Sequence, residues 1–311
     1  MEKAFVLPES KIAINGNSAP DPISARASRT IEPPTVFGRP REFLGNRFVY
    51  AVISQRAYGL SIGINLNPDK LCNFNCAYCE VNRDLPPRDT KVDLGVMSKE
   101  LDELLAMTYQ ERLRELPYFR TVPKELLALR EVALSGDGEP TLSPQFGEIM
   151  REVVFIRSRG KFPFFKLVLI TNTSGFDLPE VRRALKLLTS RDEIWAKFEA
   201  GTQEYMDRVN RANLSLQKVL ANILLVARER PVIIQSLFPL LQGEEPSTQE
   251  IELYAQHLLS LKNNGAQISQ VQVYSAHRPP HHPNCTHLKL KSLARIAQRV
   301  LEVTGIRAEV F

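Results

Sequence analysis

The stretch LCNFNCAYCE, residues 71 to 80, holds three of the four cysteines in this chain of 311 residues. Their spacing, Cys-x3-Cys-x2-Cys, lets one short loop point all three sulfurs at a single metal centre. A structural zinc site takes four ligands, usually as two pairs, and most iron–sulfur cubes take one cysteine on each of four irons. Cys72, Cys76 and Cys79 therefore predict a metal centre with one open position, where a small molecule can bind and react.

A fourth ligand could come only from far downstream, in HRPPHHPNCTH (277 to 287). This segment holds Cys285 and the histidines His277, His281, His282 and His287. Its composition is typical of metal binding, with a solvated loop as the alternative. Zinc completed by Cys285 or a histidine, in an RNA-binding protein, is thus one competing hypothesis, and the net charge of +5 suits it. An iron–sulfur electron carrier with four protein ligands is another.

Composition places the chain among globular proteins, because 43% of its residues are hydrophobic and 24% are charged. No apolar run approaches the roughly 20 residues of a membrane helix. The first residues lack the apolar core of a secretory signal. We therefore expect a cytoplasmic protein with reduced thiols and no membrane partner, in which clustered cysteines are ligands or catalytic groups rather than disulfides.

The pattern along the chain divides it in two. Residues 1–45 are rich in Pro, Ser, Arg and Asn and show no period, which predicts a flexible or irregular arm. Residues 46–311 alternate short apolar runs with longer amphipathic ones and are predicted to form one domain that includes a C-terminal helix and a last short strand. The predicted strands are 58–65, 131–136, 166–172, 193–199, 232–238 and 268–274. The predicted helices are 98–117, capped by Ser98 and ended by Pro117, and then 179–188, 214–228, 248–261 and 290–303.

This alternation predicts an α/β fold with parallel strands, because parallel neighbours cannot be joined by a tight hairpin. Both a barrel and an open doubly wound sheet satisfy it. In either fold the loops that leave the C-terminal ends of the strands carry the chemistry. The cysteine loop follows the first predicted strand and so lies at that end.

Three features together resemble the radical S-adenosylmethionine (radical SAM) superfamily. CNFNCAYC (72 to 79) resembles its CxxxCxΦC signature, with Tyr78 as the aromatic residue Φ, and SGDGEPTL (135 to 142) is similar to its GGE motif. The order of strands and helices over roughly residues 50 to 305 is similar to its partial (β/α)6 TIM-like barrel. The resemblance therefore implies that barrel.

Within the superfamily, the chain looks closest to the wyosine-synthase-like branch. The shared stretches are YGLSIGINLNP before the cysteine loop, SGDGEPTL, ITNTSG (170 to 175) and VQVYSAHRPP (271 to 280). The tricyclic-wyosine enzymes of archaea carry additional N-terminal cysteines, whereas no cysteine precedes Cys72 here. A tRNA substrate is therefore not implied, and tRNA, a peptide and a small metabolite all fit.

The resemblance implies one [4Fe-4S] cluster on Cys72, Cys76 and Cys79, with S-adenosylmethionine on the open iron. One electron, from a low-potential donor of the flavodoxin or ferredoxin type, would cleave the cofactor to a 5′-deoxyadenosyl radical that takes hydrogen from a substrate. The implied cofactor-binding residues are Tyr78 beside the adenine, Gly136, Asp137, Gly138 and Glu139 near the amino group, and Asn172 near the ribose or carboxylate.

Further candidates come from the predicted strands. Alternation in EIWAKFE (193 to 199) puts Trp195, Lys197 and Glu199 on one side, and buried charges need partners. Lys197 is a candidate for the cofactor and Glu199 for the substrate, and a salt bridge within the protein is the alternative for both. Gln235, Tyr274 and Arg278 are further substrate candidates; Arg278 suits a carboxylate or phosphate, or is a surface residue. The sequence assigns no catalytic residue.

Overall fold

The structure is a computed structural model that describes residues 43–276, 280 and 284–311. The arm predicted for residues 1–45 lies outside the described residues except for its last three. Of these three, Phe43 is buried and its ring meets that of Phe119 edge to face, with 6.2 Å between the centroids. The packed domain therefore includes Phe43.

One sheet of eight strands, in the order β1-β2-β3-β4-β5-β6-β8-β10, forms the centre of the fold. The strands are β1 Val49–Ser54, β2 Gly59–Asn65, β3 Leu129–Ser135, β4 Leu167–Thr171, β5 Glu193–Lys197, β6 Val232–Leu237, β8 Ile268–Tyr274 and β10 Ala308–Val310. All six predicted strands are present, together with the short last one. β1 pairs antiparallel with β2, and the remaining pairs are parallel.

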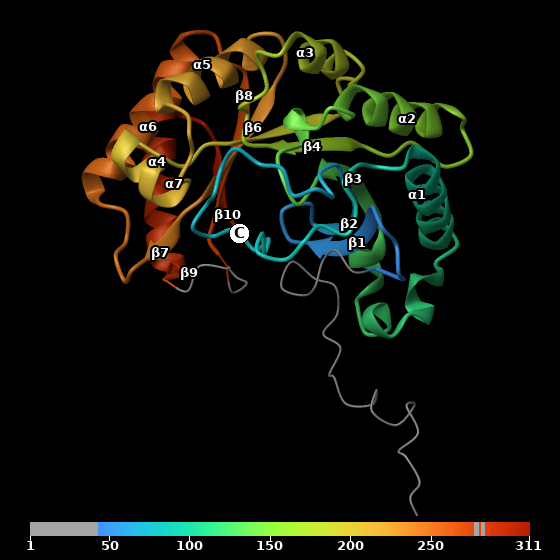
Figure 1. Ribbon diagram of the computed structural model, residues 1–311. Helices are drawn as coiled ribbons and strands as arrows, with labels where there is room; N and C mark the ends of the chain where they lie inside the picture. The colour runs from blue at the N-terminus through green and yellow to red at the C-terminus, as the bar shows by residue number, and fades with distance from the viewer. Residues whose placement is uncertain (1–42, 277–279, 281–283) are drawn as a thin grey trace, which may run out of the picture. The chain divides into compact units, whose positions relative to one another are not determined.

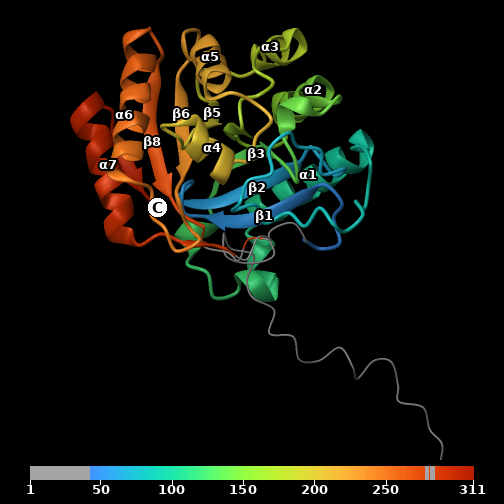
Figure 2. The same ribbon diagram turned by 60° about the vertical axis from the view of Figure 1, so that its left-hand side comes forward.

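The strand order decides between the two predicted architectures. A doubly wound sheet reverses its order at a switch point, whereas these strands follow one another in chain order without reversal. The crossover helices therefore all cover one face, and Figures 1 and 2 show them outside an arc of strands. The result is the predicted partial barrel of β/α units.

The helices differ from the predictions mainly at their ends. They are α1 Leu94–Tyr109, α2 Phe146–Ser158, α3 Pro179–Leu185, α4 Gln203–Val209, α5 Leu216–Ala227, α6 Thr248–Asn263 and α7 Leu290–Thr304. Sequence reasoning missed α2, whose VVFI run also suits a strand, and the two-turn α4. It also missed β1 and the antiparallel pair of β7 Pro239–Leu241 and β9 Cys285–His287.

The predicted start and end of the first helix were wrong. Asp93 caps it, because its carboxylate accepts the N–H of Val96 at 3.1 Å. Ser98 lies inside the helix and donates to Glu152 at 2.7 Å. Pro117 begins a short 3-10 turn well after the helix has ended, consistent with the fit of proline to a first helical position.

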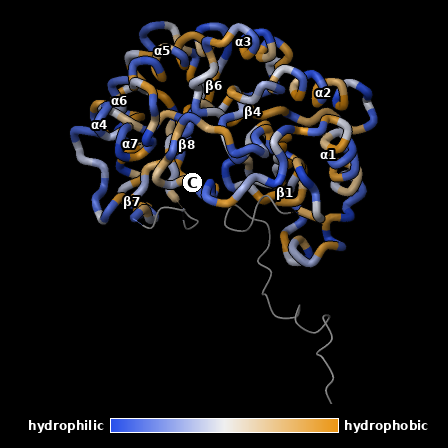
Figure 3. The backbone as a smooth tube through the Cα atoms, in the orientation of Figure 1, coloured by the Kyte–Doolittle hydropathy of each residue, from blue (hydrophilic) through white to orange (hydrophobic). Residues whose placement is uncertain are grey.

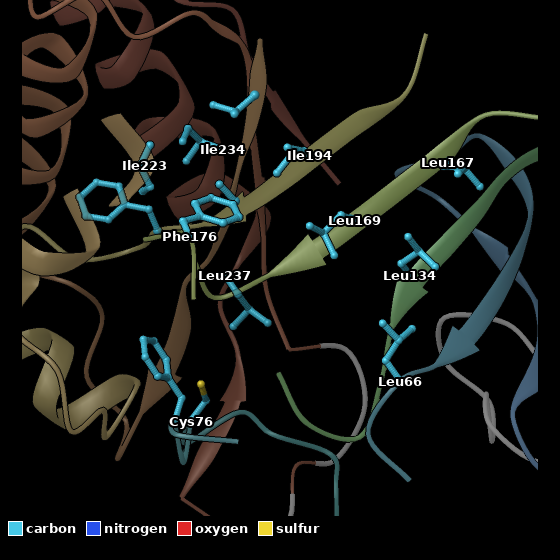
Figure 4. Packing of buried hydrophobic residues seen from close by; sticks show 14 of the residues in the cluster. Leu66, Cys76, Leu134, Leu167, Leu169, Phe176, Ile194, Ile223, Ile234 and Leu237 are labelled. Atoms are coloured by element: carbon cyan, nitrogen blue, oxygen red, sulfur yellow. The ribbon is translucent and has the colours of Figure 1, made fainter. Parts of the chain in front are cut away.

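Alternate strand residues face two different environments. The outward set, including Leu134, Leu169 and Ile194, packs against the helices (Figure 4), and hydrophobic segments follow the strands in Figure 3. The inward set contains a small apolar group of Val168, Trp195 and Ile233, with polar residues around it. The barrel interior is thus only partly filled by apolar side chains.

Side chains join the two ends of the sheet. Tyr58, in the turn between β1 and β2, donates from its hydroxyl to Glu309 of β10 and meets the Phe311 ring at 5.7 Å. Arg56 of the same turn lies over the Tyr274 ring, 4.3 Å from its centroid. Since β1 and β10 do not pair in the sheet order, these contacts form a seam made of side chains. Among the described helices, none has the length and hydropathy to cross a membrane.

Asp192 ties α2 to β4 from the turn before β5. Its side chain is 0% exposed and that of Arg157 is 7% exposed, and the two form paired bonds of 2.7 and 3.1 Å. Asp192 also accepts the N–H groups of Leu167 and Thr189. Burial by itself would raise the pKa of Asp192, but these donors outweigh burial and lower the pKa below its ordinary value.

We expect Asp192→Asn to reduce the free energy of unfolding by about 3 kcal/mol at neutral pH, because it leaves a buried guanidinium without its counter-ion. A depressed pKa stabilises the fold above the ordinary aspartate pKa of 3.8, and this contribution is lost as the pH falls through the folded value. Urea unfolding of both proteins should therefore converge at acid pH. The control, Asp102→Asn, removes surface ion pairs with Arg159 and Lys161 and should cost less than about 1 kcal/mol. Equal losses for both variants would contradict this assignment.

Candidate functional site

The cysteine loop leaves the C-terminal end of β2, as predicted, and is held by its backbone. The N–H of Ala77 donates to Val209 O at 2.7 Å, and that of Asn75 donates to Asn210 O at 3.1 Å, so the loop lies on the end of α4. None of the four cysteines is in a disulfide. Three free thiols are thus fixed at the edge of the barrel where parallel strands end.

A cavity of about 300 Å³ lies inside the barrel next to this loop. Twelve of the fourteen residues predicted for the site line it: Cys72, Cys76, Cys79, Tyr78, Gly136, Asp137, Gly138, Glu139, Asn172, Lys197, Gln235 and Tyr274. Glu199 does not line it and lies behind Tyr78, to which it is hydrogen-bonded. Arg278 and three of the histidines noted above, His277, His281 and His282, lie outside the described residues.

The surroundings of the thiols suit a cluster of several irons. Burial raises the pKa of Cys72 to about 11 and also raises that of Cys76, so these thiols stay protonated unless a metal cation displaces the proton. Across the described residues, no three His, Cys, Asp or Glu side chains converge as a single bound ion requires. The three thiols instead share the wall of one cavity, which fits a larger inorganic group.

Cys285, the competing fourth ligand, lies elsewhere. It is buried on β9, pairs with Leu241 of β7 and does not line the cavity. His287, two residues later, is exposed. Neither residue thus joins the three thiols at the cavity wall.

The turn after β3, Gly136–Glu139, packs directly on the cysteine loop. The Asn65 amide donates to the Asp137 carboxylate at 2.7 Å, and the Asn65 carbonyl oxygen accepts the Asp137 N–H at 2.9 Å. The Glu139 N–H donates to Leu71 O at 2.9 Å. At Gly138 a Cβ atom would lie 1.8 Å from that same Leu71 oxygen, so only glycine allows this approach.

Glu139 joins the turn to the end of β4. One carboxylate oxygen accepts from the Thr141 N–H, the Thr141 hydroxyl and the Thr171 hydroxyl, and the other accepts from the Asn172 N–H at 2.6 Å. Burial raises the pKa of Glu139 in spite of these donors. The carboxylate positions Asn172, whose own amide donates to Asn73 at 2.9 Å and approaches the Cys72 sulfur at 3.9 Å.

A second polar group lies under Tyr78. The Tyr78 hydroxyl and the Asn210 amide both donate to one oxygen of Glu199, while the other oxygen has no partner among the residues described. Lys197 faces the Tyr78 ring, 4.8 Å from its centroid. Burial would lower the pKa of Lys197, but Cys76 and Glu199, when ionised, outweigh burial and raise it. The ammonium group therefore stays charged at the cavity wall.

The mutual salt bridge considered for Lys197 and Glu199 is not formed within the described residues. The hydrogen bonds of Glu199 go to Tyr78 and Asn210 instead. Sequence reasoning missed Asn65, Asn73 and Asn210, which hold the turn and the cysteine loop. Asn65 ends a predicted strand, which was the available signal, whereas Asn210 is distant in sequence and gave none.

The family model of the radical SAM superfamily matches residues 66–253, more than half of the chain. The chain belongs to the radical SAM superfamily. The superfamily predicted from the cysteine and GDGE motifs is therefore confirmed. As a radical SAM protein it is an enzyme, and an iron–sulfur cluster and S-adenosylmethionine are the cofactors of its family.

Curated relatives are identical to this radical SAM chain at about a quarter of the aligned positions. A UPF0026 protein of Helicobacter pylori (strain J99) is 26% identical over 237 residues, which are 75% of this chain and 68% of the relative. A UPF0026 protein of Synechocystis is 28% identical over 178 residues, or 56% of this chain and 57% of the relative.

Solved structures share the fold at low identity. A spore photoproduct lyase variant is 11% identical, has a TM-score of 0.52, and is matched over 79% of this chain and 75% of its own. TYW1 with a bound lysine–pyruvate adduct is 15% identical and has a TM-score of 0.49. The match covers 79% of this chain and 74% of the TYW1 chain. The likeness to the lyase supports the partial-barrel fold alone.

We expect Gly138→Ala to separate the GDGE turn from the cysteine loop, because the new methyl group meets a backbone oxygen that cannot rotate away. Affinity for S-adenosylmethionine, measured by calorimetry on reconstituted protein, should fall at least about tenfold, or about 1.4 kcal/mol.

Gly147→Ala is the matched control. It lies in α2 with only ordinary contact to Arg151 at 3.5 Å, and alanine favours a helix. Its affinity should equal that of the unchanged protein. Wild-type affinity in Gly138→Ala would show that the turn does not hold the cofactor.

Proposed function

We propose that this radical SAM enzyme cleaves S-adenosylmethionine on one [4Fe-4S] cluster held by Cys72, Cys76 and Cys79. The observation that carries the proposal is the cavity wall, which combines three buried or half-buried thiols with the GDGE turn. Neither Cys285 nor His287 reaches this wall to close the open iron. When bound, the cluster would pass one electron to the sulfonium and give methionine and a 5′-deoxyadenosyl radical that takes hydrogen from the substrate.

Each polar group at this end of the cavity has a role in the proposal. The backbone carbonyls of Gly136 and Gly138 accept from the cofactor ammonium, since glycine allows close approach. Asn172, held by Glu139 and Asn73, binds the ribose or carboxylate. Tyr78 packs on the adenine, with its hydroxyl anchored on Glu199. Lys197 supplies a positive charge beside the thiolate of Cys76 and the cofactor carboxylate.

Enclosure is as important as ligation. A primary carbon radical reacts with whatever reaches it, so the reacting atoms must be held close together and away from water. The cavity lies inside the barrel, and Trp195, Leu237 and Ile170 give it apolar walls between the cysteine loop and its far end. These walls would keep the radical away from solvent and the substrate hydrogen near it.

The electron would come from a low-potential carrier of the flavodoxin or ferredoxin type. The cysteine loop offers the shortest route, because Leu71 beside Cys72 is 49% exposed while the thiols lie just beneath. Reduced thiols and such a carrier both fit the cytoplasm, which we propose as the compartment.

The decisive experiment is anaerobic reconstitution, followed by iron and sulfide counting and electron paramagnetic resonance with and without S-adenosylmethionine. About four irons per chain, a signal that changes on adding the cofactor, and release of 5′-deoxyadenosine after reduction are expected. Zinc in place of iron, or a signal indifferent to the cofactor, would refute the proposal.

Single Cys→Ala variants test the ligand set. Changes at Cys72, Cys76 or Cys79 should each lower bound iron to a small fraction of the wild-type amount, because each removes one of only three protein ligands. Cys285→Ala is the matched control, since Cys285 is also buried and free but does not line the cavity. Its iron content should equal that of the unchanged protein, and a loss there would favour the zinc-type site instead.

A further inference from the structure

The cavity has a second polar end, away from the cysteine loop. There it is lined by Ser61, Glu131, Trp195, Tyr274 and Arg56. Glu131 lies four residues before the end of β3 at Ser135, which at about 3.3 Å per residue puts it about 13 Å below the GDGE turn. Glu131, Ser61 and Arg56 are thus distinct from the residues proposed to hold the cofactor, whereas Tyr274 also lies within electrostatic range of Lys197 and Tyr78.

Glu131 is buried, and only one of its two carboxylate oxygens has a hydrogen bond from the described residues. Its side chain points inward from β3, as do those of Ala133 and Ser135, and the residue is 1% exposed. One carboxylate oxygen accepts from the Ser61 hydroxyl at 3.0 Å, and the other has no hydrogen-bond partner within the described part of the chain. Burial raises the pKa of Glu131 to about 7. An unpartnered buried oxygen destabilises a fold, so a function at this position is the usual reason for retaining one.

Arg56 supplies the opposite charge. Its guanidinium lies 4.3 Å from the Tyr274 ring centroid and 5.7 Å from that of Trp195, so two aromatic faces hold it at the cavity wall. Across the part of the chain that the structure describes, no carboxylate forms an ion pair with it. Arginine presents five N–H donors in a plane, which suits a carboxylate.

The two charges face one cavity without meeting. Arg56 is close enough to lower the pKa of Glu131, yet the two groups are not within the 4.0 Å of an ion pair. The space between them is complementary to a ligand that carries one negative and one positive group. Its carboxylate would pair with Arg56, and its ammonium would satisfy the free oxygen of Glu131.

We propose that this end of the cavity binds the carboxylate and ammonium of a small zwitterion, an amino acid or a close relative, as the substrate of the enzyme. The role as substrate rests on the proposed function, whereas the binding itself does not. Gln235, which is buried and also lines the cavity, lies beside Lys197 in the strand register, and its amide nitrogen has no hydrogen-bond partner among the described residues, so it offers a further donor between this end and the cofactor. Held at this end, the remainder of the molecule extends toward the cofactor.

Calorimetry with a panel of α-, β- and γ-amino acids tests the class of ligand, with matched carboxylic acids that lack the amine and matched amines that lack the carboxylate. At least one amino acid should bind, and its two matched analogues should bind at least about tenfold more weakly, because a site built for a polar group rejects a ligand without it. Arg56→Gln and Glu131→Gln should each weaken that binding by a similar factor. Failure of every amino acid to bind, or equal binding of the matched acids, would overturn the proposal.

Each titration is run on cluster-loaded and on cluster-free protein, with iron content and S-adenosylmethionine affinity measured on the same samples. Missing iron or missing cofactor binding would count against the proposed function. Normal iron and cofactor binding without amino-acid binding would count against this inference alone.

A stability comparison needs no ligand. Glu131→Gln should leave the melting temperature of the ligand-free protein unchanged or raise it, because half of that carboxylate has no partner within the described chain. Glu139→Gln is the matched contrast, since that buried glutamate accepts four hydrogen bonds, and its melting temperature should fall by several degrees. An equal fall in both variants would make Glu131 a structural residue and overturn its role in binding.

Discussion

The site depends on one carboxylate. Glu139 accepts two hydrogen bonds from Thr141, which follows the turn after β3, and two from Thr171 and Asn172 at the end of β4. Its backbone N–H donates to Leu71, the residue before Cys72. Three segments that are far apart in sequence are thereby fixed at one point. Loss of any of these donors would leave part of the buried carboxylate unsatisfied, so the network holds the cysteine loop against the ends of β3 and β4.

One face of the sheet packs against the helices and stabilises the fold, and the other face lines the cavity of the site. The outward residues are almost all aliphatic and pack on helices, so that face follows ordinary core rules. The inward face carries Glu131 and Gln235, each of which has a polar atom without a hydrogen-bond partner among the described residues. Such groups reduce stability, so their position on the cavity wall fits the binding roles proposed above.

The sequence predicted the strands of this structure better than the ends of its helices, and the reasons are physical. Buried parallel strands such as 232–238 are continuous apolar runs flanked by turns, and all six were predicted within one or two residues. Helix ends were predicted less well. Ser98 satisfies the rule for a cap, but Asp93 is the cap, because the helix begins four residues earlier and Met97 already lies on its buried face.

Local motifs identified the cysteine loop and the GDGE turn, because each is contiguous. The asparagines that hold them, and the placement of Arg56 and Glu131 on the wall of one cavity, come from tertiary structure. No short stretch of sequence carries that information. Gly138 shows the difference: the sequence indicated a tight turn there, and only the structure shows that Leu71 O occupies the place of its missing side chain.

The seam between Arg56, Tyr58 and the final residues has a consequence for size. In a closed barrel, the number of strands and their shear fix the radius, because every edge is hydrogen-bonded to the next. Here side chains span the last gap, between the β1–β2 turn and β8 and β10. The last gap in the wall is therefore spanned by an arginine and a tyrosine rather than by paired backbone. No strand register depends on this contact, so its width follows from the length and rotamers of those side chains.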